Sequence, residues 1–308
     1  NKQEFQEAVH KKKIFRILKE GIHAFSILRK KKSYMKKAIQ NLEADYVIST
    51  RIEYADLLSK YAPSGVKTIT QEHLHNDSPE YIKRMQKACR NIDYLVALGP
   101  GSKENYVRWL DGNRKIEIVQ IPNLLDKVPN LSSDLRSMQI VSVGRLHPVK
   151  DFCSLIDVFE LVQKQIPEAR LTIVGGGEER AKLEAKVKEK RLNGKVVITG
   201  MVDKERVQET MLYASVYAMT SLTECFPMVL LESFSCGVPA VAFDVPVGPK
   251  AIIKEGENGH LIQEEMANRI IEILTNKTKR EKLGKNAKRD AYQYLPEAVM
   301  PKWKEILK

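Results

Sequence analysis

The hydrophobic positions of this chain alternate between short apolar runs and longer stretches in which apolar residues recur every three to four positions. Short apolar, β-branched runs are typical of strands, and the 3.6-residue period is typical of amphipathic helices. The first part of the chain predicts strands near residues 45–50, 66–71, 93–98 and 115–122, with helical stretches between the first three. Strands that alternate with helices predict βαβ units around a parallel sheet.

A second series of strand-like runs follows a break in the pattern. Residues 122–135, which read PNLLDKVPNLSSDL, are rich in Pro, Asn, Asp and Ser and predict a linker. The continuous apolar runs beyond it are typical of parallel strands buried on both faces. They lie near residues 139–144, 169–175, 195–200, 215–221 and 238–243, and from about residue 264 onward the pattern is helical.

These patterns predict an α/β protein with two doubly wound, Rossmann-like domains. We expect the N-terminal domain over residues 1–135 and the C-terminal domain from residue 136. In such folds ligands lie beyond the carboxyl ends of the strands, so the residues that follow each strand are the candidates for chemistry.

Composition adds little to the fold but points to a partner surface. The chain has 308 residues, of which 43% are hydrophobic and 29% charged, as in packed globular proteins. The four cysteines have no metal-binding spacing and suit a reducing cytosol. The net charge of +12 is concentrated in residues 1–40, which hold twelve Lys and Arg against three Glu. Such an excess suits an anionic surface or substrate, or a solvated helix face. Apolar residues there predict an amphipathic basic helix: Ile14, Ile17, Leu18, Ile22, Phe25 and Leu28.

Charged and small residues follow two of the expected strands in the C-terminal half. Arg145 and Lys150 lie between a strand and a helix that starts near Asp151, where two cations beside a helix N-terminus suit a phosphate group. Ordinary surface charges are the alternative. Three glycines, Gly175 to Gly177, allow close approach of a ligand to the backbone, or form a plain tight turn.

The stretch TECFPMVLLESFSCG holds two glutamates, Glu224 and Glu232, with seven residues between them. Pro227 suits the first turn of a helix that we expect over residues 227–236, ending at Gly237. Glu224 precedes this helix, and Glu232 lies within it among large apolar residues. A buried carboxylate is costly unless hydrogen-bond donors satisfy it, and adjacent ribose hydroxyls are suitable donors. The alternative is that Glu232 occupies the solvent-facing stripe of the helix.

Five motifs in this order resemble the C-terminal half of the family-4 retaining glycosyltransferases of the GT-B fold. They read VSVGRLHPVKD, LTIVGGGEERAKLE, VVITGMV, TSLTECFPMVLLESFSCGVPAVAF and GENGHLI, and the resemblance is close over about residues 115–265. It implies transfer of a sugar from a nucleotide-sugar, with UDP favoured, to a glycan or lipid-linked acceptor in capsule, exopolysaccharide or related glycan assembly. It also implies that the C-terminal domain ends at residue 293 and that the helical tail 294–308 returns to the N-terminal domain. Against the family pattern, the N-terminal domain lacks its first strands.

The resemblance also assigns roles to residues. Glu224 contacts the donor sugar, Glu232 binds the ribose, and Arg145 and Lys150 hold the diphosphate and stabilise it as it leaves. His73, with His75 as its competitor, faces the donor sugar and the acceptor. The remaining expected contacts to the nucleotide-sugar are Gly144, Gly175, Gly200, Met201, Val202, Cys225, Phe226, Pro227, Met228 and Val229.

No metal and no cofactor is expected. The sequence contains no Asp-x-Asp pair of the kind that metal-dependent transferases use, so the cations and the helix dipole would neutralise the leaving group. We expect a cytoplasmic protein that is peripheral on the inner face of the plasma membrane through its basic front, and no nucleic-acid partner. A catalytically silent GT-B protein that binds another transferase is the alternative function, and a nucleotide-sugar epimerase fits less well.

Overall fold

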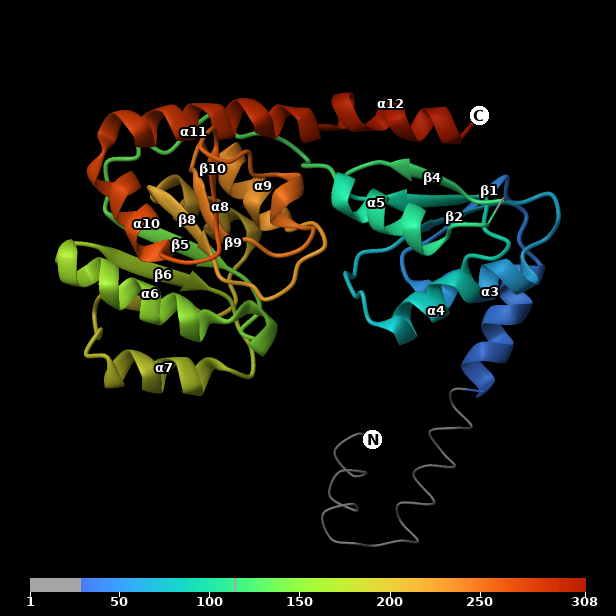
Figure 1. The fold of residues 1–308 in the computed structure, drawn as a ribbon, viewed down its shortest axis with the longest axis horizontal. Coiled ribbons are helices and arrows are strands. Elements are labelled where there is room, and N and C mark those ends of the chain that lie inside the picture. Colours follow the sequence, from blue (N-terminus) through green and yellow to red (C-terminus); the bar gives the residue numbers. More distant parts are fainter. Residues whose placement is uncertain (1–28, 114) are drawn as a thin grey trace, which may run out of the picture. The chain divides into compact units, whose positions relative to one another are not determined.

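The computed structural model describes residues 29–113 and 115–308 (Figure 1). The predicted amphipathic helix between Ile14 and Leu28 lies outside the described residues. Contacts divide the described chain into two compact units. The first unit holds the described residues up to Gln71, with Ser78–Leu95 and Gly112–Glu117, and the second holds Glu72–Asp77, Val96–Asp111 and Ile118–Lys308.

The first four strands form one sheet, which confirms the four strands predicted for the front of the chain. Their order in the sheet is β1 (Tyr46–Ser49), β2 (Lys67–Gln71), β3 (Tyr94–Ala97) and β4 (Glu117–Gln120). The helices between them are α3 (Ile52–Tyr61), α4 (Pro79–Ala88) and α5 (Pro100–Trp109), and residues 29–40 are also helical. β1 and β2 are parallel, as a βαβ unit requires. Helix α4 begins where the sequence dictates, because the hydroxyl of Ser78 accepts a hydrogen bond from the Tyr81 amide and Pro79 occupies the first turn.

The second unit contains a parallel sheet of six strands in the order β10-β9-β8-β5-β6-β7. The strands are β5 (Gln139–Val143), β6 (Arg170–Val174), β7 (Val196–Ile198), β8 (Val216–Met219), β9 (Ala240–Phe243) and β10 (Gly259–Ile262). The α-helices that follow β5 are α6 (Phe152–Gln165), α7 (Arg180–Glu189), α8 (Lys204–Leu212), α9 (Met228–Ser235), α10 (Met266–Thr275), α11 (Lys277–Ala291) and α12 (Pro296–Ile306). Short 3₁₀ helices are η1 (Pro148–Lys150), η2 (Pro249–Ala251) and η3 (Tyr292–Tyr294). The five strands expected in this half are confirmed, whereas β10 was not expected.

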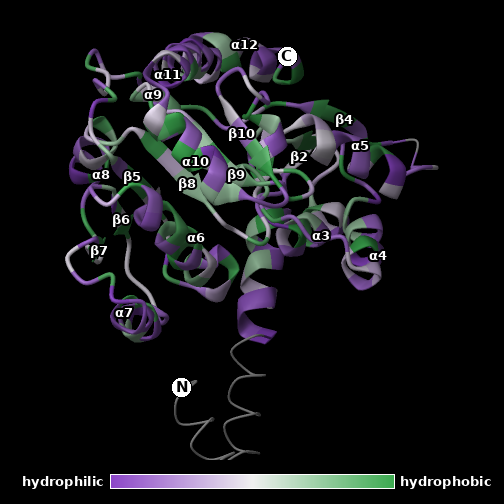
Figure 2. Ribbon diagram, turned by 60° about the vertical axis from the view of Figure 1, so that its left-hand side comes forward, coloured by the Kyte–Doolittle hydropathy of each residue, from purple (hydrophilic) through white to green (hydrophobic). Residues whose placement is uncertain are grey.

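Both faces of this sheet are covered, which explains why its strands read as continuous apolar runs. Alternate residues of a strand point to opposite faces. Ile140 and Val216 pack with α6, α7 and α10, and their neighbours Val141 and Tyr217 pack with α8, α9 and α11. Figure 2 shows hydrophobic residues along β8 and β9 and mostly hydrophilic residues on α7. The doubly wound architecture predicted from the sequence is therefore confirmed.

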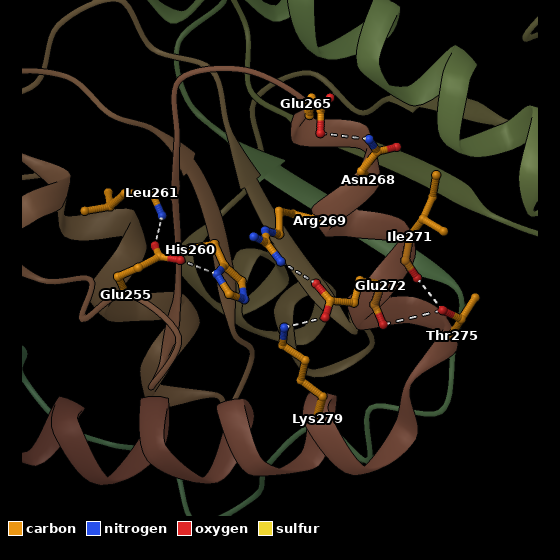
Figure 3. A network of polar contacts seen from close by, with 10 residues as sticks. All are labelled: Glu255, His260, Leu261, Glu265, Asn268, Arg269, Ile271, Glu272, Thr275 and Lys279. Atoms are coloured by element: carbon orange, nitrogen blue, oxygen red, sulfur yellow. Dashed lines mark hydrogen bonds and ion pairs between the residues drawn. The ribbon is translucent and has the colours of Figure 1, made fainter.

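Polar contacts fasten the edge strand β10 and the helices beside it (Figure 3). The carboxylate of Glu255 lies 2.6 Å from Nδ1 of the buried His260 and accepts a hydrogen bond of 2.7 Å from the Leu261 amide. On α10, Glu272 pairs with Arg269 of the same helix at 2.8 Å and with Lys279 of α11 at 2.6 Å. These contacts hold the end of the sheet and the two helices in register.

The segment predicted as a linker packs on the second unit. The Ser133 hydroxyl donates to the carbonyl of Ala214 at 2.6 Å, and the Lys288 ammonium donates to the carbonyls of Pro129 and Leu131, each at 2.9 Å. The compact units therefore differ from the boundary expected at residue 135, since residues 118–135 and the tail 294–308 both group with the second unit. The return of the tail to the N-terminal domain stays a prediction.

Among the helices formed by residues 29–113 and 115–308, none combines the length and the apolar character needed to cross a bilayer.

Candidate active site

The loops after β5, β6 and β7 are bound to one another by their backbones. The Gly144 amide donates to the Val174 carbonyl at 2.9 Å, and the Leu146 amide donates to the Gly176 carbonyl at 3.0 Å. The Gly175 amide in turn donates to the Gly200 carbonyl at 3.0 Å. Three strand ends thus form one frame at the carboxyl edge of the sheet, where a doubly wound fold binds its ligand.

The glycines of this frame are needed because the loops touch. A Cβ on Gly175 would lie 1.9 Å from the Gly144 carbonyl oxygen, and one on Gly177 would lie 2.3 Å from the Leu146 oxygen. Both glycines also have φ above +140°, which side chains rarely adopt. Close packing of loops accounts for these glycines, and the Gly175 amide is used within the frame. Contact of Gly144, Gly175 and Gly200 with the nucleotide-sugar stays a prediction.

Lys150 and Glu224, two of the four predicted catalytic residues, form an ion pair. Lys150 is the last residue of η1, and Glu224 lies in the loop between β8 and α9. Their side chains are 23% and 12% exposed, so the pair is largely withdrawn from water. The Thr220 hydroxyl joins the two loops by donating to the carbonyls of Lys150 and Asp151. The left-handed Asp151 (φ 44°) then caps α6 by accepting from the Ser154 amide.

The loop between β9 and η2, which contains Gly248, packs against Glu224. A Cβ on Gly248 would lie 2.6 Å from the Cβ of Glu224 and 2.8 Å from its carbonyl oxygen. Only glycine at position 248 therefore leaves Glu224 where it is. This contact was not expected from the sequence, because it joins segments 24 residues apart through the fold.

Helix α9 confirms the predicted helix to within one residue at each end. Pro227 occupies the N-cap position, one residue before the first-turn position expected for it, and Gly237 has the positive φ of 73° expected after a helix. No side chain caps the N-terminus of α9. The first backbone N–H groups of a helix have no partner inside it, so those of Met228 and Val229 are available to an anion.

Glu232, one turn into α9, lines a cavity of about 190 Å³. Burial raises the pKa of its carboxyl group, an effect that nearby Lys204 opposes and nearby Asp126 reinforces. Within the part of the chain that the structure describes, neither carboxylate oxygen has a hydrogen-bond or ion-pair partner. A half-buried carboxylate without a protein partner can be satisfied by water or by a ligand, so the ribose-binding role of Glu232 stays a prediction.

The same cavity brings together residues that the sequence did not single out. Asp126 comes from the predicted linker and Lys204 from the first turn of α8, and their charged atoms lie 2.5 Å apart. The only sequence signal was Asp203, a good N-cap residue that sets the start of α8 just after Gly200, Met201 and Val202, which are expected to contact the nucleotide-sugar. The other cavity residues are Leu124, Leu125, Lys127, Val207, Gln208, Met211, Met228, Ser235 and Cys236.

The remaining predicted residues divide into exposed and buried groups. Arg145 is exposed, and among the described residues its guanidinium makes no hydrogen bond or ion pair. Met201 is 88% exposed and Val202 37%. Cys225 and Phe226 are buried, and burial raises the pKa of the Cys225 thiol to about 12, so this thiol is protonated and is a poor nucleophile at neutral pH.

His73 and His75 lie in the segment that follows β2. Partial burial lowers the pKa of both imidazoles, against the opposing charge of Glu72 on His73 and of Asp77 on His75. Both rings are therefore neutral near pH 7. The assignment of His73 to the donor sugar and the acceptor stays a prediction.

The sequence and the fold match a known class of proteins. The sequence profile of the family "Glycosyl transferases group 1" matches residues 127–290, which is more than half of the chain. The chain is 35% identical over 262 residues to the amylovoran biosynthesis glycosyltransferase AmsD of Erwinia amylovora, covering 82% of this chain and 73% of AmsD. It is 29% identical over 284 residues to an exopolysaccharide phosphotransferase of Streptomyces coelicolor, covering 88% of this chain but only 29% of that protein.

Solved structures share the fold. A complex of Staphylococcus aureus TarM with UDP superimposes with a TM-score of 0.76 at 20% identity, covering 89% of this chain and 57% of TarM. A complex of Anabaena HepE with UDP gives a TM-score of 0.76 at 18% identity, covering 90% of this chain and 81% of HepE. The chain has the GT-B fold, with two Rossmann-like sheets. It belongs to the group 1 glycosyltransferase family.

Proposed function

We propose that this chain is a retaining, metal-independent hexosyltransferase. It moves a sugar from a nucleotide-sugar, with UDP favoured as the nucleotide, to a glycan or lipid-linked acceptor. Family membership supports the reaction class. The observation that carries the nucleotide assignment is Glu232, a half-buried carboxylate with no partner among the described residues, which lines a cavity between α8, α9 and residues 124–127.

The donor lies along α9, with its ribose at Glu232 and its diphosphate at the N-terminus of the helix. The ribose hydroxyls donate to Glu232, which satisfies the carboxylate. The diphosphate then lies toward the uncapped N-terminus of α9 and the cations of Arg145 and Lys150, one turn closer to the strand ends. Glu224 follows the diphosphate and accepts hydrogen bonds from the sugar hydroxyls. Its ion pair with Lys150 couples sugar binding to the position of the phosphate-binding ammonium.

The chemistry requires neutralisation of the leaving group more than activation of a nucleophile. When the bond between the anomeric carbon and the diphosphate breaks, negative charge grows on the diphosphate oxygen. Arg145, Lys150 and the α9 dipole stabilise that charge, and removing one such group typically costs about 10²–10³ in rate. The acceptor hydroxyl attacks from the face that the diphosphate vacates and gives its proton to a diphosphate oxygen. The anomeric configuration is then retained without a protein nucleophile.

The acceptor is proposed from the relatives and from charge. The relatives include an exopolysaccharide phosphotransferase, an amylovoran biosynthesis glycosyltransferase and a poly(glycerol-phosphate) alpha-glucosyltransferase. Residues 29–40 carry six Lys and Arg and no acidic residue, and those cations are exposed. Such a helix is attracted to an anionic membrane surface, where a lipid-linked acceptor would lie. We therefore place the reaction in surface-glycan assembly at the cytoplasmic face of the membrane.

Nucleotide binding is tested first. UDP-, GDP- and ADP-glucose are each added to the full chain in a thermal-shift experiment, because a ligand that binds only the folded state raises its stability. We expect UDP-glucose to raise the melting temperature most. If none of the three raises it, the proposed function is wrong.

Turnover is tested with a charge-balanced variant. Lys150→Met/Glu224→Gln removes both partners of the ion pair and leaves no unpaired charge behind. We expect UDP release from UDP-glucose in the presence of a lipid-linked glycan extract to fall about 10²–10³-fold, with the melting temperature little changed. Arg206→Met/Glu209→Gln, an exposed pair on α8, is the matched control. Full activity of the Lys150→Met/Glu224→Gln variant would refute the roles assigned to these two residues. If the unchanged chain binds the nucleotide but shows no turnover, the catalytically silent alternative is favoured. Metal independence predicts that EDTA does not change the rate. Retention predicts that the sugar in the product has the same anomeric configuration as in the donor.

A further inference from the structure

The cavity around Glu232 is lined by two carboxylates, Glu232 and Asp126, and by two lysines, Lys127 and Lys204. The Lys204 ammonium lies 2.5 Å from the Asp126 carboxylate, and the charges of both act on Glu232. Asp126 and Glu232 are thus both possible acceptors for the Lys204 ammonium. In the structure Asp126 holds it, and Glu232 has no partner among the residues described.

The backbone is anchored near Asp126, Lys204 and Glu232. The conformation of the Lys204 side chain therefore decides which carboxylate its ammonium pairs with. The segment before Asp126 is anchored because Leu125 is buried and its amide donates to the Tyr294 carbonyl at 2.8 Å. Lys204 is in the first turn of α8, which the Asp203 carboxylate caps by accepting from the Arg206 amide at 2.8 Å. A lysine side chain is long and 71% exposed here, so it can turn toward either carboxylate.

We propose that Asp126 is a positioning residue for the donor nucleotide: it holds the Lys204 ammonium away from Glu232 and keeps that carboxylate free to accept ribose hydroxyls. This inference rests on the proposed function, because it concerns the nucleotide cavity. Without Asp126, Lys204 pairs with Glu232. The ribose must then displace an ion pair before it can bind.

Simple electrostatics predicts the opposite change in UDP affinity when Asp126 loses its charge. UDP is an anion, so removing the negative charge of Asp126 would by itself strengthen binding. The proposed role predicts that Asp126→Asn weakens binding. The loss should be about three- to fivefold, since an exposed ion pair is worth at most about 1 kcal/mol. It should shrink at high salt, which screens the competing pair.

The experiment is a double-mutant cycle on the full chain, read by isothermal titration with UDP. Asp126→Asn should weaken binding, while Lys204→Met should stay within about threefold of the unchanged protein because it removes the competitor. In the Lys204→Met background, Asp126→Asn should have little effect. Asp126→Glu, which keeps the charge, should retain affinity. Glu209→Gln removes a matched exposed partner from Arg206 on the same helix and should leave affinity unchanged.

Four other results would contradict the positioning role of Asp126. Equal or tighter binding by Asp126→Asn overturns the inference, as does an equal loss in the Lys204→Met background. A loss on Lys204→Met alone as large as that on Asp126→Asn would make Lys204 a direct ligand and also overturn it. If the unchanged chain binds neither UDP, GDP nor ADP, the proposed function fails and the inference fails with it. Melting temperatures of all variants separate these outcomes from misfolding.

Discussion

Replacing Glu232 by glutamine should make the empty protein more stable while it abolishes nucleotide binding. Burial raises the pKa of this carboxyl group in the folded chain. A carboxyl whose pKa rises on folding is ionised less readily when folded than when unfolded. Its ionisation therefore destabilises the fold fully above the folded pKa and not at all below the unfolded pKa. Glutamine has a similar shape and no charge, so it removes this penalty at neutral pH.

The size of the gain follows from the setting of the side chain. The carboxylate lacks a partner among the described residues, but one side of it faces the open cavity of about 190 Å³, so water reaches it. The penalty should therefore be at the low end for an unsatisfied buried polar group, about 1 kcal/mol. For a folding unit of 150–250 residues, this corresponds to a rise of about 2–4 °C in melting temperature.

The assay is thermal unfolding of both proteins between pH 4 and pH 8, with and without UDP. The melting temperature of Glu232→Gln should exceed that of the unchanged chain at pH 7, and the two should converge as the pH falls. UDP should stabilise only the unchanged chain. Glu160→Gln is a control of opposite sign, because Lys190 and Lys164 lower the pKa of Glu160 to about 2 and its ionisation stabilises the fold at neutral pH. A lower melting temperature for Glu232→Gln at pH 7 would refute the reasoning, since the carboxylate would then be satisfied in the empty protein.

Two further substitutions test the frame of the site. Gly248→Ala places a methyl group 2.6 Å from the Cβ of Glu224, so one of the two loops must move. We expect about 1–3 kcal/mol of destabilisation in urea unfolding and loss of donor turnover. Normal turnover would contradict the contact. Ser133→Ala removes a buried hydroxyl that donates to the Ala214 carbonyl at 2.6 Å and accepts from the Leu135 amide at 3.0 Å. It should cost about 1–3 kcal/mol in the same measurement with unchanged UDP affinity, and a loss of affinity would mean that the segment acts on the cavity.

The sequence predicted the elements whose signal is local. The strands from β1 to β9 and helix α9 followed from apolar runs and from turn residues such as Pro227 and Gly237. β10 has four residues and begins with Gly259 and His260, so it offers no β-branched run to recognise.

The site was predictable only where one segment carries the pattern. The spacing of Glu224 and Glu232 can be read from the chain itself, and so can the place of Lys150 in the loop after β5. The closeness of Asp126 to Lys204, and of Gly248 to Glu224, arises because separate loops meet in space. Asp126 sat in a segment that reads as a linker, and nothing local marks it as a neighbour of α9.

The backbone frame at the strand ends has a consequence for how such a site can diversify. The loops after β5, β6 and β7 are joined through main-chain atoms, so their geometry does not depend on the identity of the side chains that point outward. Met201, at 88% exposed, can be exchanged with little effect on that geometry. Glycines 175 and 177 cannot, because a side chain there would separate the loops. Substitutions at such outward-facing positions should therefore leave the joined loops in place.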